Sequence, residues 1–236
     1  MVTLLSVAGK AWRFVRRHRW SLPLAAGSLL SFIELAEEMR EGEVAAFDAV
    51  VASNVTAWRG SLDWPMVALT RSGEGKWMAL ACVAAVIALF SFRKRREAAF
   101  VAACGIAGGL LSTALKLAFQ RTRPDATAGY LIDLPSSFSF PSGHAMGSAC
   151  VAGSLAIVAF ALLRSPWRWL ALIAAFFYIV GVGVSRVYLG VHFASDVLGG
   201  QLASAAVVAA MTGWFFPRLL PGEATKHPAP APPGGA

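Results

Sequence analysis

The sequence predicts an all-α integral membrane protein, folded as a bundle of six transmembrane helices. Hydrophobic residues make up 57% of the 236 residues and charged residues only 14%, whereas a soluble domain carries about 25% charged residues. The apolar residues are concentrated in blocks close to the roughly 20 residues that a spanning helix needs. The basic residues fall in short clusters between these blocks, which is typical of topology signals. No nucleic-acid partner is therefore expected.

Six candidate spans follow one another along the chain. The first has the weakest pattern, because Glu34, Glu37 and Glu38 crowd its end. Between the first two spans, Phe47, Val50, Val51, Val55 and Trp58 recur at helical spacing with polar residues between them. This pattern predicts an amphipathic helix lying along the membrane interface. The spans are expected near residues 21–37, 75–92, 97–117, 143–163, 168–186 and 193–216.

The distribution of charge predicts three parts and an orientation. Residues 1–20 are expected to form a basic cytoplasmic segment, and residues 21–216 the six-helix membrane domain. Residues 217–236 contain no pattern that could bury a core, so a disordered tail is expected. Alternate connections and the two ends carry 13 of the 21 lysines and arginines. The positive-inside rule places these connections and both termini in the cytoplasm.

Three polar stretches fall on the opposite face, which the rule expects to be poor in positive charge. They are KLAFQRTRP (116–124), PSGH (141–144) and SRVYLGVHFASD (185–196). Four basic residues in them need an explanation: Lys116, Arg121, Arg123 and Arg186. A charge at the end of an apolar helix, as at Lys116, is costly and usually marks function. Because the spans alternate in direction, the three stretches can converge on one pocket.

The residue types in these stretches predict a phosphate site. Lys116, Arg123 and Arg186 offer three cations, and the arginine fork suits phosphate oxygens. Ser142 and Gly143 stand at a predicted helix N-terminus, where backbone N–H groups bind anions. The sequence shows no carboxylate pair suited to magnesium, so neither a metal nor another cofactor is expected.

Two histidines predict the reaction. His192 and Asp196 share a helix face at spacing i, i+4, so Asp196 can orient His192 as a nucleophile. His144, from another loop, can protonate the leaving group as a general acid. Each feature also has a purely structural explanation, since a histidine at a helix start or a His–Asp pair is often only a satisfied polar contact. The enzyme interpretation is favoured because all three stretches lie on one predicted face.

Together the stretches resemble the signature of the type 2 phosphatidic acid phosphatase family, which shares its active site with vanadium haloperoxidases and glucose-6-phosphatase. The signature is Lys, six residues and Arg-Pro; then Pro-Ser-Gly-His; then Ser-Arg, five residues, His, three residues and Asp. This sequence contains every part. The resemblance implies a nucleophile at His192, its partner at Asp196 and an acid at His144. It also implies a phosphate held by Lys116, Arg123, Ser142, Gly143 and Arg186.

The resemblance further implies a lipid phosphatase of the bacterial inner membrane, whose site faces the periplasm or the cell exterior. Undecaprenyl diphosphate is the first expected substrate. Phosphatidic acid, phosphatidylglycerol phosphate and phosphotransfer to a lipid or sugar acceptor are alternatives. A haloperoxidase is disfavoured because those relatives are soluble, and a non-enzymatic lipid-binding protein because the histidines and the aspartate are intact. The oligomeric state is not predicted.

Overall fold

The computed structural model describes residues 20–125, 132 and 134–216, and these residues form eight helices with no strand among them. The predicted all-α class is confirmed. The predicted terminal segments, residues 1–20 and 217–236, lie outside the described residues apart from Trp20. The helices are α2 (Ser21–Glu41), α3 (Ala45–Thr56), α4 (Asp63–Ser72), α5 (Gly75–Ser91), α6 (Arg95–Phe119), α7 (Gly143–Leu162), α8 (Trp167–Tyr188) and α9 (Ala194–Phe215).

Six long helices, α2 and α5 to α9, coincide with the six predicted spans to within a few residues. Four of them, α6 to α9, are long and apolar enough to cross a membrane. The bent pair α4–α5, with an angle of 53°, would make a fifth span. Helix α2 has 21 residues but carries several acidic residues in its second half. The membrane class is confirmed, whereas the predicted count of six spans is not.

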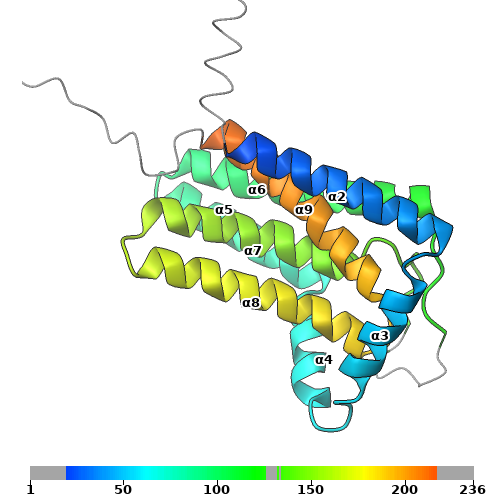
Figure 1. Ribbon diagram of the computed structural model, residues 1–236. Helices are drawn as coiled ribbons and strands as arrows, with labels where there is room; N and C mark the ends of the chain where they lie inside the picture. Colours follow the sequence, from blue (N-terminus) through cyan, green and yellow to red (C-terminus); the bar gives the residue numbers. More distant parts are fainter. Residues whose placement is uncertain (1–19, 126–131, 133, 217–236) are drawn as a thin grey trace, which may run out of the picture.

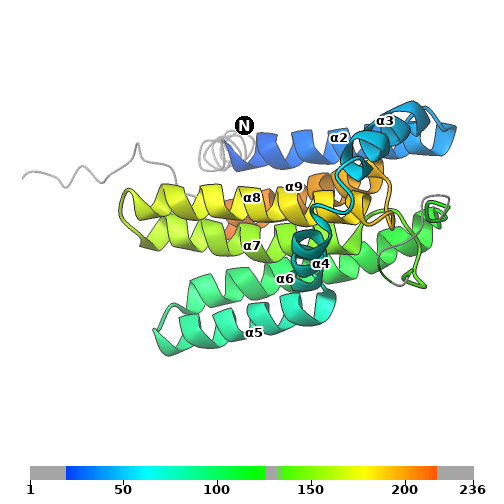
Figure 2. The ribbon, with the colours of Figure 1, turned by 90° about the horizontal axis from the view of Figure 1, so that it is seen from below.

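The long helices run side by side, and α3 and α4 lie across one end of the bundle (Figures 1 and 2). Helix α3 lies where the amphipathic helix was predicted, and α4 is a second helix that was not predicted. The C-terminal ends of α6 and α8 and the N-terminal ends of α7 and α9 also lie at this end (Figure 1). The described ends of the chain lie at the opposite end of the bundle. Residues from four helix ends can therefore meet beneath α3 and α4.

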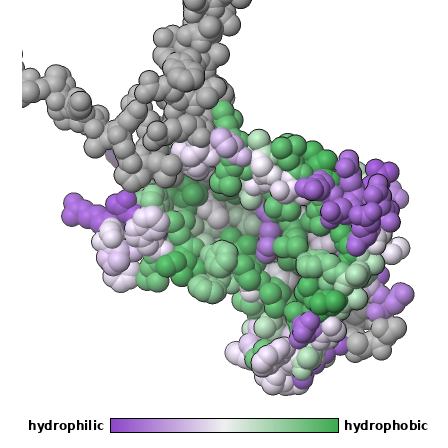
Figure 3. Space-filling view, viewed as in Figure 1, coloured by the Kyte–Doolittle hydropathy of each residue, from purple (hydrophilic) through white to green (hydrophobic). Residues whose placement is uncertain are grey.

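On the face shown in Figure 3, the middle of the bundle is largely apolar, and hydrophilic residues gather toward its two ends. Large hydrophobic side chains are exposed on the outer helices, for example Leu80, Ile87, Leu110 and Phe177. Such a surface would be unfavourable in water but suits contact with lipid tails.

Close packing fixes the start of α7 against its neighbours. A Cβ added to Gly200 of α9 would lie 2.9 Å from the carbonyl oxygen of Ser142. A Cβ added to Gly199 would lie 2.6 Å from the ring of Phe140. The Phe140 ring stacks on Phe32 with a centroid distance of 5.8 Å, and its centroid lies 5.0 Å from that of Phe119. The segment that leads into α7 is therefore held between α2, α6 and α9.

Candidate active site

All eight predicted site residues lie at the end of the bundle that α3 and α4 cover. The bundle architecture brings them together from four places: the end of α6, the start of α7, the end of α8 and the turn into α9. In chain order they are Lys116, Arg123, Ser142, Gly143, His144, Arg186, His192 and Asp196.

His192 lies between a carboxylate and a guanidinium. Its Nδ1 is 3.2 Å from Oδ2 of Asp196, and its Nε2 is 3.0 Å from Nη1 of Arg123. Arginine can only donate, so Nε2 must be the acceptor in that contact. The hydrogen of the neutral ring is therefore on Nδ1, where it is donated to Asp196. The tautomer leaves the Nε2 lone pair facing the arginine.

The imidazole of His192 is buried, with 3% of the residue exposed. Burial lowers the pKa of His192 to about 3, an effect that outweighs the hydrogen bond and the charge of Asp196, which raise it. Desolvation disfavours the charged ring because water no longer solvates it. His192 is thus neutral near pH 7, which is the form that a nucleophile requires.

Asp196 is held by more groups than the sequence predicted. Its Oδ2 accepts from the Ser139 hydroxyl at 2.5 Å and from the Phe193 N–H at 2.9 Å, in addition to His192. Ser139 is fully buried, and its Oγ also lies 3.3 Å from Nδ1 of His192. Sequence reasoning missed Ser139, because a serine in a loop has no periodic or spacing signal.

Arg123 and Lys116 tie the segment before α7 to the rest of the site. Arg123 donates from Nε to the Ser137 carbonyl at 2.8 Å and from Nη1 to the Val191 carbonyl at 2.7 Å. Lys116 donates from Nζ to the Phe138 carbonyl. A Cβ on Gly143 would lie 3.7 Å from Cε of Lys116. The two cations therefore lie beside both the nucleophile and the start of α7.

Arg186 is buried with 1% of its surface exposed. Its Nη1 donates to Oγ1 of Thr70 on α4 at 2.5 Å, a contact that the sequence did not predict. Within the described part of the chain, its Nε and Nη2 have no acceptor. Buried donors without an acceptor are rare and costly, and they fit a site built to bind an anion.

Helix α7 begins at the predicted N-terminus, and its contacts limit which backbone N–H groups can bind an anion. Ser142 is the N-cap of α7, and its Oγ accepts from the Ala145 N–H at 3.5 Å. The N–H of Ser142 itself donates to the Asp196 carbonyl at 2.9 Å. Helix geometry leaves the N–H groups of Gly143 and His144 without an intrahelical acceptor, so they are the backbone donors available to an anion. His144 lies close enough to His192, Arg186, Arg123 and Lys116 for their charges to act on it.

Comparison with known proteins agrees with this geometry. The model of a protein family described as the PAP2 superfamily matches residues 96–219, which include every predicted site residue. The chain belongs to the PAP2 superfamily. It is a membrane phosphatase, and relatives in this superfamily are named for lipid phosphates.

Relatives within the PAP2 superfamily include named lipid phosphatases. The chain is 33% identical to phosphatidylglycerophosphatase B of Bacillus subtilis over 72% of its own length and 84% of that protein. It is 32% identical to decaprenylphosphoryl-5-phosphoribose phosphatase of Mycobacterium tuberculosis over 73% of its own length and 90% of that protein. A crystal structure of a transmembrane PAP2-type phosphatidylglycerolphosphate phosphatase from Bacillus subtilis matches with a TM-score of 0.72 and 30% identity. That match covers 81% of this chain and 95% of the other.

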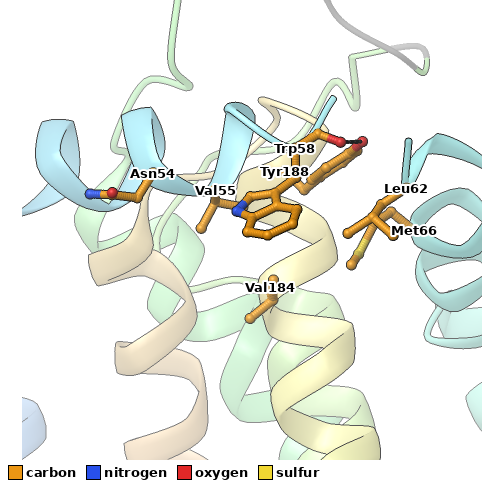
Figure 4. Close-up of a pocket in the computed structure, with 7 residues that line it drawn as sticks. All are labelled: Asn54, Val55, Trp58, Leu62, Met66, Val184 and Tyr188. Atoms are coloured by element: carbon orange, nitrogen blue, oxygen red, sulfur yellow. Dashed lines mark hydrogen bonds between the residues drawn. The ribbon is translucent and has the colours of Figure 1, made fainter. Parts of the chain in front are cut away.

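This PAP2 protein also has an apolar pocket of about 370 Å³ between α3, α4 and α8, which is separate from the predicted site residues (Figure 4). Its α8 lining is Val184 and Tyr188, whereas Arg186 projects from a different face of α8 because residues two apart do not share a helix face. In the described residues, no group of three or more His, Cys, Asp or Glu side chains could hold a metal ion.

Proposed function

We propose that this protein hydrolyses a lipid-borne phosphate through a phosphohistidine on His192, without a metal. The observation that carries the proposal is the position of His192. Its Nδ1 lies against Asp196 and its Nε2 lies 3.0 Å from Arg123. An oriented, neutral imidazole beside a cation is the arrangement that attack on a bound phosphate requires.

In the first step, Nε2 of His192 attacks phosphorus and the bond from phosphorus to the lipid oxygen breaks. The departing oxygen takes a proton from His144, and the ring of His192 becomes cationic. Asp196 stabilises that cation through Nδ1–H. Lys116, Arg123, Arg186 and the N–H groups at the start of α7 bind the equatorial phosphate oxygens in the transition state.

In the second step, water attacks the phosphorus of the phosphohistidine and the P–N bond breaks. Neutral His144 takes the proton from that water, which restores its acid form, and inorganic phosphate leaves. His192 returns to the neutral form that its buried position favours. His144 thus acts first as the acid and then as the base, and the mechanism needs no other proton carrier.

We place a phosphomonoester on a lipid headgroup ahead of the diphosphate that the family resemblance implied. The two relatives are named for phosphatidylglycerophosphate and for decaprenylphosphoryl-5-phosphoribose, and each of those compounds carries a terminal monoester phosphate. Both relatives are matched over more than 80% of their length. Undecaprenyl diphosphate, phosphatidic acid and transfer to an acceptor other than water become outcomes of the test.

The site would face the periplasm or the cell exterior. The basic cluster Arg93–Arg96 spans the α5–α6 connection and the start of α6, and Arg164 and Arg168 lie in the α7–α8 connection and the first turn of α8. Both clusters are at the end of the bundle away from the site. The positive-inside rule assigns that end to the cytoplasm. In a cysteine-free background, Asp125→Cys should react with an impermeant maleimide in intact cells, whereas Arg164→Cys should react only after lysis. The reverse pattern would contradict this orientation.

The activity test measures phosphate release from phosphatidylglycerophosphate, phosphatidic acid and undecaprenyl diphosphate in detergent micelles containing EDTA. Phosphatidylglycerophosphate should be hydrolysed fastest, with the activity unchanged by EDTA. The His192→Ala variant should be inactive, and an acid-labile phosphoenzyme should be trapped with the wild type only. Turnover by His192→Ala, or a strict need for magnesium, would remove this mechanism. A different order within the panel would change the substrate and leave the mechanism standing.

A further inference from the structure

A second carboxylate, Asp48 on α3, is buried behind the proposed catalytic pair. Only 4% of Asp48 is exposed, although it lies on a helix whose neighbouring Phe47 and Val50 are exposed. The buried face of α3 therefore includes a charge. A buried carboxylate is costly unless it is paired and hydrogen-bonded, so its partners show what it is for.

Those partners lie in the first turn of α9, beside Asp196. Oδ1 of Asp48 accepts from the Ser195 N–H at 2.8 Å, and Oδ2 accepts from the Ser195 hydroxyl at 2.7 Å. The backbone bond satisfies one of the N–H groups that a helix N-terminus leaves without a partner. Asp48 is thus an external cap for the helix that carries Asp196.

Arg121 connects the two carboxylates. Its Nη2 lies 2.9 Å from Oδ2 of Asp48, and its Nη1 lies 2.7 Å from Oδ1 of Asp196. Nη1 also donates to Oγ of Ser195 at 2.7 Å, and the guanidinium carbon lies 4.1 Å from the ring centroid of Phe193. Both terminal nitrogens are therefore occupied by protein acceptors. In this respect Arg121 differs from Arg186, whose Nε and Nη2 have no acceptor among the described residues and suit a phosphate.

The charges of this cluster bear on the reaction. Two carboxylates and one guanidinium leave a net charge of −1. If Arg121 faced Asp196 alone, the pair would be neutral, and Asp196 would stabilise a cationic ring poorly. Asp48 lies on the other side of Arg121 and offsets its positive charge. The Arg121 guanidinium can therefore hold the Asp196 carboxylate in place without cancelling the negative charge of that carboxylate.

We propose that Asp48 and Arg121 are positioning residues that hold Asp196 in place and preserve its negative charge for His192. This inference rests on the proposed function, because it assigns a role through the pair Asp196–His192. Neither residue is expected to contact the substrate. Their loss should therefore lower kcat and leave KM nearly unchanged.

The test uses two single variants and their combination, assayed with phosphatidylglycerophosphate in micelles. Asp48→Asn keeps an acceptor for the Ser195 N–H but makes the net charge of the cluster zero. Arg121→Gln makes it −2. The double variant returns it to −1, as in the wild type. A role in packing alone predicts that the double variant is at least as impaired as either single variant.

We expect Asp48→Asn to lower kcat about 10–100-fold, as losses of supporting groups around an active site commonly do, with KM within about 3-fold of wild type. The double variant should recover at least about 5-fold in kcat over Asp48→Asn, because the charge is restored. The rate of phosphoenzyme formation, measured by rapid quench, should follow kcat. All rates are normalised to monodisperse protein after gel filtration.

Asp63→Asn is the matched control, since it removes the charge of another carboxylate with two hydrogen bonds, from the Tyr188 hydroxyl and the Gly60 N–H. It should keep kcat within about 3-fold of wild type, because none of its bonds reaches Asp196. A normal kcat in Asp48→Asn, a loss confined to KM, or a double variant no better than Asp48→Asn would overturn the inference. If His192→Ala is inactive in that case, the proposed function survives. Activity in His192→Ala would instead remove the proposed function itself.

Discussion

The two histidines of the site occupy opposite environments. The ring of His192 is buried and contacts Asp196, Ser139 and Arg123 within 3.3 Å. His144 is half-buried at the start of α7, and no side chain in the described part of the chain is hydrogen-bonded to its imidazole. One side of the site is therefore fixed, and the other side is open.

This difference follows from what each group has to do. A nucleophile must present one nitrogen, in one tautomer, along one line of attack, so its orientation has to be set before the substrate binds. A general acid must reach an oxygen whose position depends on the headgroup. Freedom of the His144 ring suits that task. This difference between the two histidines can be tested by removing the group that orients His192 and, separately, by removing the proton donor His144.

The largest effect is expected from Asp196→Asn, which removes the constraint on His192. An asparagine amide can donate to Nδ1, which would put the ring hydrogen on Nε2 and block attack. A change of this kind in another oriented histidine costs about 10⁴ in kcat, and we expect a loss of about 10³–10⁴ here. Phosphate release and phosphoenzyme trapping measure it. An active Asp196→Asn variant would show that the orientation of His192 is set by other groups.

The role of His144 is tested with the His144→Gln variant and two substrates whose leaving groups differ in their need for a proton. An alkoxide leaving from a lipid phosphate needs a proton, so kcat should fall about 10²–10⁴-fold. p-Nitrophenoxide leaves without one, so phosphoenzyme formation from p-nitrophenyl phosphate should fall less than about 10-fold. Equal losses with both substrates would mean that His144 binds phosphate or supports the fold and does not act as the acid.

The same contrast explains which parts of the site the sequence could predict. The eight motif residues face the reaction, so the chemistry restricts their types. The predicted pair His192–Asp196 forms, but His192 precedes the N-cap Phe193 and lies outside α9, so the turn into the helix brings the two side chains together and the predicted shared helix face is wrong. Their supports are different. Thr70 meets Arg186 across 116 positions, and Asp48 meets Ser195 across 147. A polar residue at such a distance has no periodic signal, because only the three-dimensional packing selects its partner.

The fold likewise has features that the sequence could predict and features that it could not. Hydropathy located the six long helices to within a few residues, since apolar blocks of membrane length leave few alternatives. It could not establish how many of them span the membrane. The buried residues of α2 include Phe32 and Ala36, which pack against Phe140 and Met146, while Glu34, Glu37 and Glu38 lie on the same helix. Whether such a helix crosses the bilayer depends on its neighbours, which composition alone does not specify.

A smaller effect is expected from Ser139→Ala, which removes one of the bonds to Asp196 but leaves those from His192, Phe193 and Arg121. A hydrogen bond to a charged group contributes about 1.5–3 kcal/mol. Because the other bonds remain, we expect a loss near the lower limit, about 10-fold in kcat. The loss should appear in phosphoenzyme formation and leave KM unchanged. A change confined to KM would indicate that Ser139 acts on the substrate.

The smallest effect is expected from lowering the pH of the assay. His192 must be neutral to attack, and its pKa is lowered to about 3, so the nucleophile becomes protonated only as the pH falls toward that value. After correction for the substrate phosphate, whose second pKa is about 6, kcat/KM should show no further acidic limb between pH 7 and pH 4. Replacing Asp196 removes a charge that raises the pKa of His192, so any residual limb should move to lower pH. A limb near pH 6.5 that remains in the wild type after this correction would mean that water reaches His192, and the two sides of the site would then be equally open.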